Sequence, residues 1–179
     1  MLGLYACLGR RPGLSVLAGL FIFTSCVEIA RLSSPRINEF FFRRFKSFLR
    51  DNEKSRLTGT PWYVLGAGLA FFLYDVPIGA YAVVFLACGD ATATMVGERW
   101  GRTKIVSGKS LEGTAAFVVA ALIAGTVLNA FFYPVPVVVF IVGAVVAAAV
   151  ELLPPWINDN LAIPVISGAV MLGILRFIS

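Results

Sequence analysis

Apolar residues gather in long blocks along this chain, and polar residues gather between the blocks. The apolar blocks lie near residues 13–30, 62–74, 76–96, 115–133, 135–153 and 161–178. An α-helix needs about 20 apolar residues to cross a bilayer, and most of these blocks approach that length. The pattern predicts an all-α fold, a polytopic transmembrane helix bundle of about six spans. We expect residues 1–179 to form a single integral membrane domain.

The polar segments between the blocks are unequal in charge. Residues 31–61, 97–113 and 154–160 together hold twelve of the 15 Lys and Arg residues. The remaining three, Arg10, Arg11 and Arg176, fall at the opposite ends of the apolar blocks. Because cytoplasmic loops are enriched in Lys and Arg, we expect a multi-pass protein with these three segments in the cytoplasm and both termini outside.

The segment 31–61 contains a helix signal of its own. Ser34 and Pro35 are typical of a helix start, with Ser as the N-cap and Pro at the first helical position. Apolar residues then recur on one predicted face, at Ile37, Phe41, Phe45 and Phe48. The pattern indicates a cytoplasmic amphipathic helix in the headgroup layer. A connector helix packed on the bundle is an equal and compatible interpretation.

Composition narrows the chemistry. The chain is 59% hydrophobic and 14% charged, against about 25% charged in ordinary globular proteins. It has no histidine, which excludes His-based triads and His-ligated metals. Three cysteines scattered in apolar sequence form no metal-ligand pair and are expected to be small buried apolar residues.

One polar segment stands out, Gly89–Thr114, with the sequence GDATATMVGERWGRTKIVSGKSLEGT. It places three acids, four bases and five glycines between two apolar blocks. Cations with interspersed glycines suit the binding of phosphate groups, because glycines let backbone amides approach the oxygens. The alternative is that these bases only fix the topology.

Carboxylates near this segment are candidates for a metal site. Asp90 ends an apolar block, where an unpaired charge costs about 2.5–3.5 kcal/mol, so it needs a metal or a lysine as partner. Glu112, Glu151 and Asp159 are expected at the same cytoplasmic face, and Glu28 joins them. Oxygen ligands of this kind suit Mg²⁺ or Ca²⁺. The alternatives are structural ion pairs at Asp90 and Glu112 and a simple turn at residues 158–160.

Three sequence blocks resemble a known family in the same order. GDATATMVGERWGRTKI with GKSLEGT, then ELLP and NDNLAIP, and upstream LRDNEKSRLTGTPWYVLG, are similar to the CTP-dependent lipid kinases. That family includes dolichol kinases, phytol kinases and yeast-type diacylglycerol kinases. The resemblance runs from about Glu28 to Gly168. CDP-diacylglycerol synthases share a broadly similar signature.

The resemblance implies a CTP site and assigns residues to it. The implied nucleotide-binding residues are Gly89, Gly97, Arg99, Gly101, Arg102, Lys104, Lys109, Ser110, Gly113, Arg56 and Asn160, with Thr58 and Gly59 in the matching upstream block. The candidate catalytic residues are Asp90, Asp159, Glu151 and Glu53, and the candidate metal ligands are Asp90, Asp159 and Glu112. Which carboxylate activates the acceptor is left open among Glu151, Asp159 and Glu53.

The leading hypothesis is a kinase that transfers the γ-phosphate of CTP, with Mg²⁺ (or Ca²⁺), to the hydroxyl of a membrane lipid. Dolichol or another polyprenol, a phytol-like alcohol and diacylglycerol are the candidate acceptors. Such transfer relies on positioning and charge neutralisation, which agrees with a histidine-free site. The alternatives are a phosphatidate cytidylyltransferase-type enzyme that makes a CDP-lipid, and a small membrane transporter or lipid-binding protein. We expect the bilayer as a partner and no nucleic acid, and small-residue faces permit a homodimer.

Overall fold

The computed structural model describes residues 10–45, 54–153 and 158–178, and these residues are helical with short connections. The helices are α2 (Arg10–Ser33), α3 (Pro35–Arg44), α4 (Gly59–Leu73), α5 (Val76–Val84), η2 (Phe85–Asp90), α6 (Ala91–Trp100), η3 (Val106–Gly108), α7 (Leu111–Phe131), α8 (Val137–Glu151) and α9 (Asp159–Ile178). Within the described ranges no strand occurs, so the all-α prediction is confirmed there.

Each of the six predicted apolar blocks coincides with a helical segment. Four of these segments are long and apolar enough to cross a membrane: Pro12–Ser33, Val76–Trp100, Leu111–Phe131 and Asp159–Ile178. The other two, Gly59–Leu73 and Val137–Glu151, are apolar but only 15 residues long. Four candidate spans support an integral membrane protein, and six spans remain a prediction.

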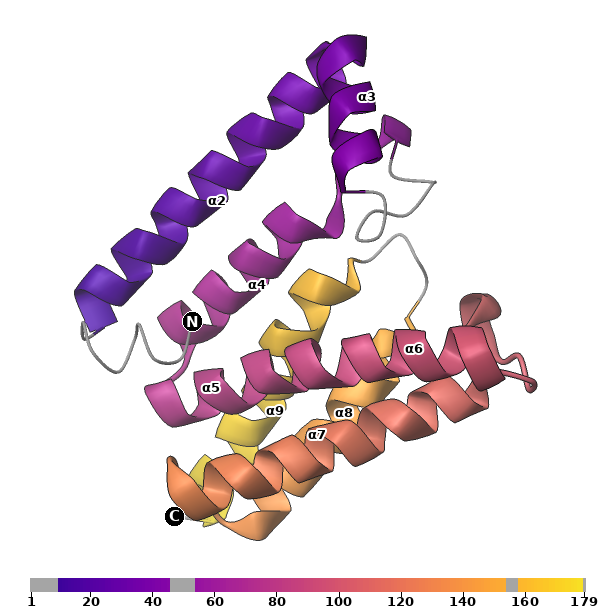
Figure 1. Ribbon diagram of the computed structural model, residues 1–179. Helices are drawn as coiled ribbons and strands as arrows, with labels where there is room; N and C mark the ends of the chain where they lie inside the picture. The colour runs from indigo at the N-terminus through magenta and orange to yellow at the C-terminus, as the bar shows by residue number, and fades with distance from the viewer. Residues whose placement is uncertain (1–9, 46–53, 154–157, 179) are drawn as a thin grey trace. The chain divides into compact units, whose positions relative to one another are not determined.

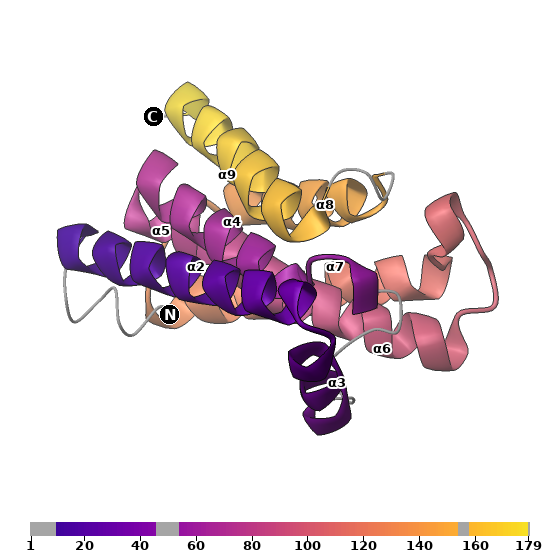
Figure 2. The same cartoon turned by 90° about the horizontal axis from the view of Figure 1, so that it is seen from above.

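The chain divides between Leu65 and Gly66 into two compact units, each described here by itself. In the first unit, α3 begins one residue after α2 ends, and it turns sharply away from the axis of α2 (Figures 1 and 2). Ser34 is the N-cap residue of α3 and Pro35 is its first residue, as predicted. A single domain over residues 1–179 stays a prediction.

The packing of α3 differs from the predicted apolar face. Ile37 and Phe45 are 43% and 41% exposed, whereas Phe42 is the buried residue of this helix. Phe48, the fourth residue of the predicted face, lies outside the described residues. The centroid of the Phe42 ring lies 5.6 Å from the guanidinium carbon of Arg31 and 5.7 Å from the amine of Lys54, so two cations contact this ring. The position of α3 in the headgroup layer remains a prediction.

The second unit is built on one long helical segment, Val76–Trp100, that runs beside α7 (Figure 1). This segment contains a π-helical turn, η2, at Phe85–Asp90. The hydroxyl of Thr92 donates to the carbonyls of Cys88 and Gly89, at 2.7 and 2.9 Å, where the backbone leaves the regular helix. The sequence predicted a polar loop from residue 97, but α6 continues to Trp100. Cys88 in η2 and Cys26 in α2 are exposed, although the sequence predicted buried cysteines.

Helices α8 and α9 complete the second unit. α8 packs against α7 and α9, and α9 also packs against α5. Aromatic residues fill the centre: the rings of Tyr81 and Phe140 stack with centroids 5.9 Å apart, and Phe85 and Phe117 are fully buried. The Tyr81 hydroxyl donates to the carbonyl of Tyr133 at 2.9 Å. The chain returns along α7 after α6, and again along α8 after α7. The loop after α6, the end of α8 and the start of α9 can therefore meet at one end of this unit.

Candidate functional site

The loop between α6 and α7 folds back on itself and returns Lys109 to the start of α7. The amide of Ile105 donates to the carbonyl of Lys109 at 2.8 Å, and the amide of Leu111 donates to the carbonyl of Thr103 at 2.9 Å. Gly108 turns the chain with φ 79°, a conformation that favours glycine. These two hydrogen bonds join the two sides of the loop, and they therefore fix the position of the Lys109 backbone.

Lys109 reaches across to the end of α8 and the start of α9. Its Nζ lies 2.9 Å from Oε1 of Glu151 and 3.3 Å from Oδ2 of Asp159, and it also donates to the main-chain carbonyl of Glu151. These residues are 42 and 50 positions away along the chain. The structure thus brings together one predicted phosphate ligand and two predicted catalytic acids.

The two carboxylates have different environments. The side chain of Glu151 is 7% exposed and that of Asp159 is 34% exposed. Among the described residues, Oε2 of Glu151 is the buried side-chain polar atom for which no hydrogen-bond partner is found. A buried carboxylate oxygen without a partner is energetically costly, so this atom is suited to bind a cation or to accept a hydrogen bond from a ligand.

Three predicted nucleotide-binding glycines pack α6 against α7. A Cβ on Gly101 would come within 2.2 Å of the carbonyl oxygen of Gly97 and 2.6 Å of Oγ of Ser110. A Cβ on Gly113 would lie 2.9 Å from the carbonyl oxygen of Ala93. The buried Ser110 caps α7, since its Oγ accepts from the amide of Gly113 at 3.1 Å. These residues therefore have a structural function, and their contact with a nucleotide stays a prediction.

The predicted metal ligands are not collected into one group. Glu112 accepts from the amide of Thr103 at 3.1 and 3.3 Å, which ties it to the loop. Asp90 is the last residue of η2 and is half-buried. Across the described parts of the chain, no three His, Cys, Asp or Glu side chains lie together as a metal-binding group. The metal assignment to Asp90, Asp159 and Glu112 remains a prediction.

The Lys109 cluster itself fits a divalent cation in part. One lysine facing two carboxylates leaves a net charge of −1, and Oε2 of Glu151 lacks a partner. Carboxylate oxygens are the ligands that Mg²⁺ prefers, and Mg²⁺ usually completes its shell with water and substrate phosphates. Asp159 and Glu151 could therefore hold such an ion together with a nucleotide.

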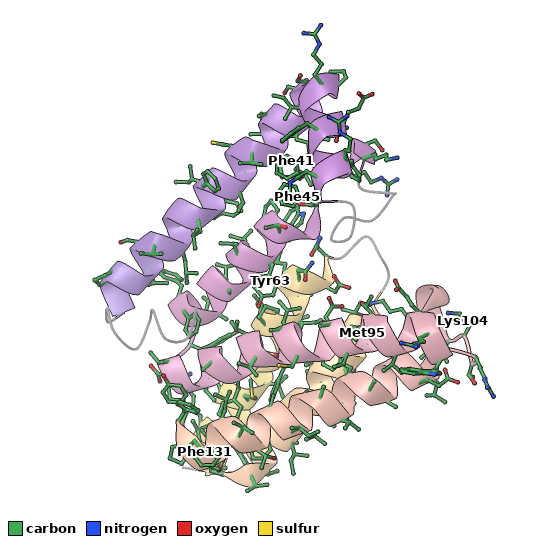
Figure 3. The ribbon with its side chains drawn as sticks, in the orientation of Figure 1. Phe41, Phe45, Tyr63, Met95, Lys104 and Phe131 are labelled. Carbon is green, nitrogen blue, oxygen red and sulfur yellow. The ribbon has the colours of Figure 1, made fainter. Side chains whose placement is uncertain are left out.

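The remaining predicted phosphate ligands are exposed. Lys104 lies in the loop beyond the end of α6 (Figure 3), and Arg102 precedes it. The guanidinium carbon of Arg99 lies 5.2 Å from the centroid of the Trp100 ring. Lys104 and Lys109 were both predicted to bind the nucleotide, but they differ, because Lys104 is exposed and Lys109 is half-buried against acids.

At the start of α9, Asn160 lies against α4. A Cβ on Gly66 would come within 2.3 Å of the carbonyl oxygen of Asn160. The amide of Asn160 donates to side-chain oxygens of Asn158 and Asp159, at 3.1 and 3.0 Å. Gly66 therefore allows the close approach that fixes the turn carrying Asp159. Gly89 is also closely packed, because a Cβ there would lie 2.5 Å from the Phe117 ring.

The first unit holds a buried ionic cluster that the sequence reading did not identify. Arg31, fully buried, donates to both oxygens of Glu28 at 3.2 and 2.8 Å and to Oδ1 of Asn38 at 2.9 Å. It also donates to the carbonyl of Arg56 at 2.6 Å, and the amide of Thr58 donates to Glu28 at 2.9 Å. An acid and a base three residues apart at the end of an apolar helix were the available signal.

This cluster fixes the segment that enters α4, where the resemblance assigns Arg56, Thr58 and Gly59. Thr58 is 4% exposed, so its match to the family block has a structural explanation. Glu53, a candidate catalytic residue, lies outside the described residues. The predicted roles of Glu53 and Arg56 in the reaction remain predictions.

Three curated proteins are similar in sequence to this chain. A phytol kinase from Synechocystis sp. is 37% identical over 116 residues, which is 59% of this chain and 50% of the relative. A CTP-dependent diacylglycerol kinase 1 from Schizosaccharomyces pombe is 27% identical over 80% of this chain and 72% of the relative. A dolichol kinase, sec59, from the same yeast is 26% identical over 81% of this chain but 31% of the relative.

No protein-family model and no solved structure matches the chain. The matched regions span about half of the phytol kinase and about a third of the dolichol kinase. The three relatives confirm the resemblance that the sequence blocks indicated, at modest identity.

Proposed function

The chain resembles the CTP-dependent lipid kinases, and from this premise we propose that it transfers the γ-phosphoryl group of CTP to the hydroxyl of a membrane lipid. A diacylglycerol, a phytol-like alcohol and a polyprenol such as dolichol are the acceptor classes that the names of the relatives suggest. In this proposal the reaction takes place at the cytoplasmic face.

The convergence of Lys109, Glu151 and Asp159 carries this proposal. A phosphoryl-transfer site needs a cation near the phosphate oxygens and an acceptor for the hydroxyl proton. Lys109 provides the cation, and two carboxylates lie within 3.3 Å of its amine. Glu151 ends α8, Asp159 begins α9 and Lys109 lies two residues before α7, so a nucleotide from water could meet a lipid hydroxyl at these helix ends.

We assign the roles by exposure. Asp159, at 34% exposure, accepts the proton of the lipid hydroxyl, whose oxygen then bonds to the γ-phosphorus. The bond between the γ-phosphorus and its bridging oxygen breaks, and CDP leaves with the bonding electrons. Glu151, at 7% exposure, positions Lys109 through its carboxylate and its main-chain carbonyl.

A divalent cation, when bound, would supply further charge neutralisation on the phosphates. Asp159 and the unpartnered Oε2 of Glu151 are the residues suited to hold it. Asp90 and Glu112 stay candidate metal ligands. The segment Val76–Trp100, which carries Asp90, and the start of α7, which carries Glu112, belong to the same unit as Lys109, Glu151 and Asp159.

The first experiment supplies the purified protein in detergent with CTP labelled at the α or the γ phosphorus, Mg²⁺ and mixed lipid alcohols. We expect γ label in one lipid and release of CDP. Label from α with pyrophosphate release would instead identify a cytidylyltransferase. A lack of transfer from either position, in a folded sample, would contradict the proposal and favour a transporter or lipid-binding protein.

Asp159→Asn tests the role assignment. This variant keeps the shape of the side chain but cannot accept a proton at neutral pH, so we expect a loss of kcat of about 10²–10⁴-fold, the range that general-base catalysis supplies. Glu151→Gln, which keeps a hydrogen-bond acceptor for Lys109, is expected to lose less. The reverse order of the two effects would move the base to Glu151.

A further inference from the structure

Helix α3 presents a second surface with a distinct composition. Phe40 is 57% exposed, and the arginines one turn away on the same side, Arg36, Arg43 and Arg44, are exposed as well. This basic aromatic face, defined by these four residues, lies opposite the buried Phe42. It is not the apolar face that the sequence pattern predicted.

The other side of α3 is held by the first unit. Asn38 accepts from Arg31 of α2 at 2.9 Å and donates to the carbonyl of Lys54 at 2.9 Å. The cations of Arg31 and Lys54 lie 5.6 and 5.7 Å from the centroid of the Phe42 ring. These contacts fix the rotation of α3 about its axis, so the basic aromatic face is directed away from α2.

The position of α3 along the chain brings this face to a membrane surface. α2 contains a candidate span that ends at Ser33, and α3 begins at Pro35. With one residue between Ser33 and Pro35, their Cα atoms are at most about 7 Å apart, so the first turn of α3 lies close to the end of the candidate span. Because α3 turns away from the axis of α2 in both views, it does not continue along the direction of the span (Figures 1 and 2).

We propose that the basic aromatic face of α3 binds the anionic phosphates of bilayer lipids. Three arginines carry the charge that complements such phosphates, and guanidinium groups bind them in a bidentate manner. The exposed Phe40 ring is apolar and the arginines beside it are charged, so together they form an amphipathic face. The long arginine side chains can extend toward the headgroups while the aromatic ring enters the apolar boundary. Lipid binding at this face would go beyond substrate recognition and does not depend on the proposed reaction.

The binding has an electrostatic signature. A basic residue near an anionic membrane surface favours binding by roughly fivefold, so three arginines favour it by at most roughly a hundredfold. The exposed Glu39, one turn from Arg36 and from Arg43, offsets part of this charge. Salt should weaken it, because the screening length falls from about 10 Å at 0.1 M to about 3 Å at 1 M. If the face instead packed against a protein through Phe40 alone, salt would not weaken the binding.

The test places a spin label on α3 of the full chain in lipid nanodiscs. Phe40→Cys is made in a background where Cys7, Cys26 and Cys88 are replaced by Ala, and the accessibility of the label to oxygen and to a water-soluble relaxing agent is measured. We expect the label to be deeper in nanodiscs with equal parts phosphatidylglycerol and phosphatidylcholine than in phosphatidylcholine alone. High salt should remove the difference.

Variants of the arginines identify the source of the effect. Changing all three arginines to Gln should abolish the difference between the two lipid compositions, whereas changing all three to Lys should retain most of it. An equal label depth in both compositions, or a Gln variant that behaves like the parent, would overturn the proposal. Protection of the label from both agents in every lipid would indicate a protein contact and would overturn it as well.

Discussion

Replacing Lys109 with Met is the sharpest test of the candidate site, because Met keeps the length of the side chain and removes its charge. The substitution deletes the bonds of Nζ to Oε1 of Glu151, at 2.9 Å, and to Oδ2 of Asp159, at 3.3 Å. It leaves Glu151, 7% exposed, with neither carboxylate oxygen paired to Lys109. Breaking a buried ion pair costs about 3–5 kcal/mol. Because Lys109 itself is 27% exposed, we expect the lower end of this range, about 3 kcal/mol.

The matched control is Lys104→Met, in the same loop. Lys104 is exposed, and a surface substitution of this kind usually changes the free energy of unfolding by less than about 0.5 kcal/mol. Both variants are unfolded by titration with SDS in mixed micelles, and tryptophan fluorescence reports the fraction folded.

A double-mutant cycle with Glu151→Gln completes the test. Without Lys109, a neutral amide at residue 151 should be tolerated better than a buried charge. The loss in free energy of unfolding of Lys109→Met/Glu151→Gln should therefore be smaller than the sum of the two single losses by at least about 1 kcal/mol. Additive effects within about 0.5 kcal/mol would refute the ionic coupling, and so would equal losses for Lys109→Met and Lys104→Met. Phosphoryl transfer should remain lost even where the double variant recovers stability.

Further predictions concern packing and the buried cluster of the first unit. Gly66→Ala should destabilise by about 1–3 kcal/mol, because the new Cβ would meet the carbonyl oxygen of Asn160, whereas Gly19→Ala, which has open space, should be neutral or stabilising in the same SDS titration. Arg31→Met should cost at least about 3 kcal/mol and should speed hydrogen exchange at residues 54–59 more than elsewhere, since it leaves Glu28 buried without its cation. Uniform exchange across the whole chain in the Arg31 variant would contradict a local positioning role.

Much of the helical architecture could be predicted from the sequence. Apolar runs and proline positions indicated where helices begin, and Ser34–Pro35 does start α3. The apolar block at residues 76–96 predicted most of the segment Val76–Trp100, but the pattern did not reveal the π turn at Phe85–Asp90. It also predicted a polar loop from residue 97, although α6 continues to Trp100 and packs against α7.

The candidate site was only partly predictable. The blocks that resemble the family indicated Lys109, Glu151 and Asp159. No sequence pattern predicted that Lys109 forms ion pairs with the two acids while Lys104 is exposed. That difference depends on the fold-back of the loop around Gly108. The same limitation applies to α3, where helical periodicity placed Phe41 and Phe45 on the apolar face. The contacts of Arg31 and Lys54 instead select Phe42 for burial.

The packing glycines also determine where Lys109 lies, apart from any contact that they make with a nucleotide. The side chain of Lys109 begins next to Ser110, whose Oγ would lie 2.6 Å from a Cβ on Gly101 and 3.1 Å from one on Gly113. An added methyl group at Gly101 would clash with both Ser110 and the carbonyl of Gly97, so the loop that leads to Lys109 must shift. A shift of even 1 Å at Lys109 changes a contact of 2.9 Å into one too long for a good hydrogen bond. Gly101→Ala should therefore impair phosphoryl transfer by displacing Lys109, while Gly173→Ala, with nothing within 4 Å, should leave it unchanged.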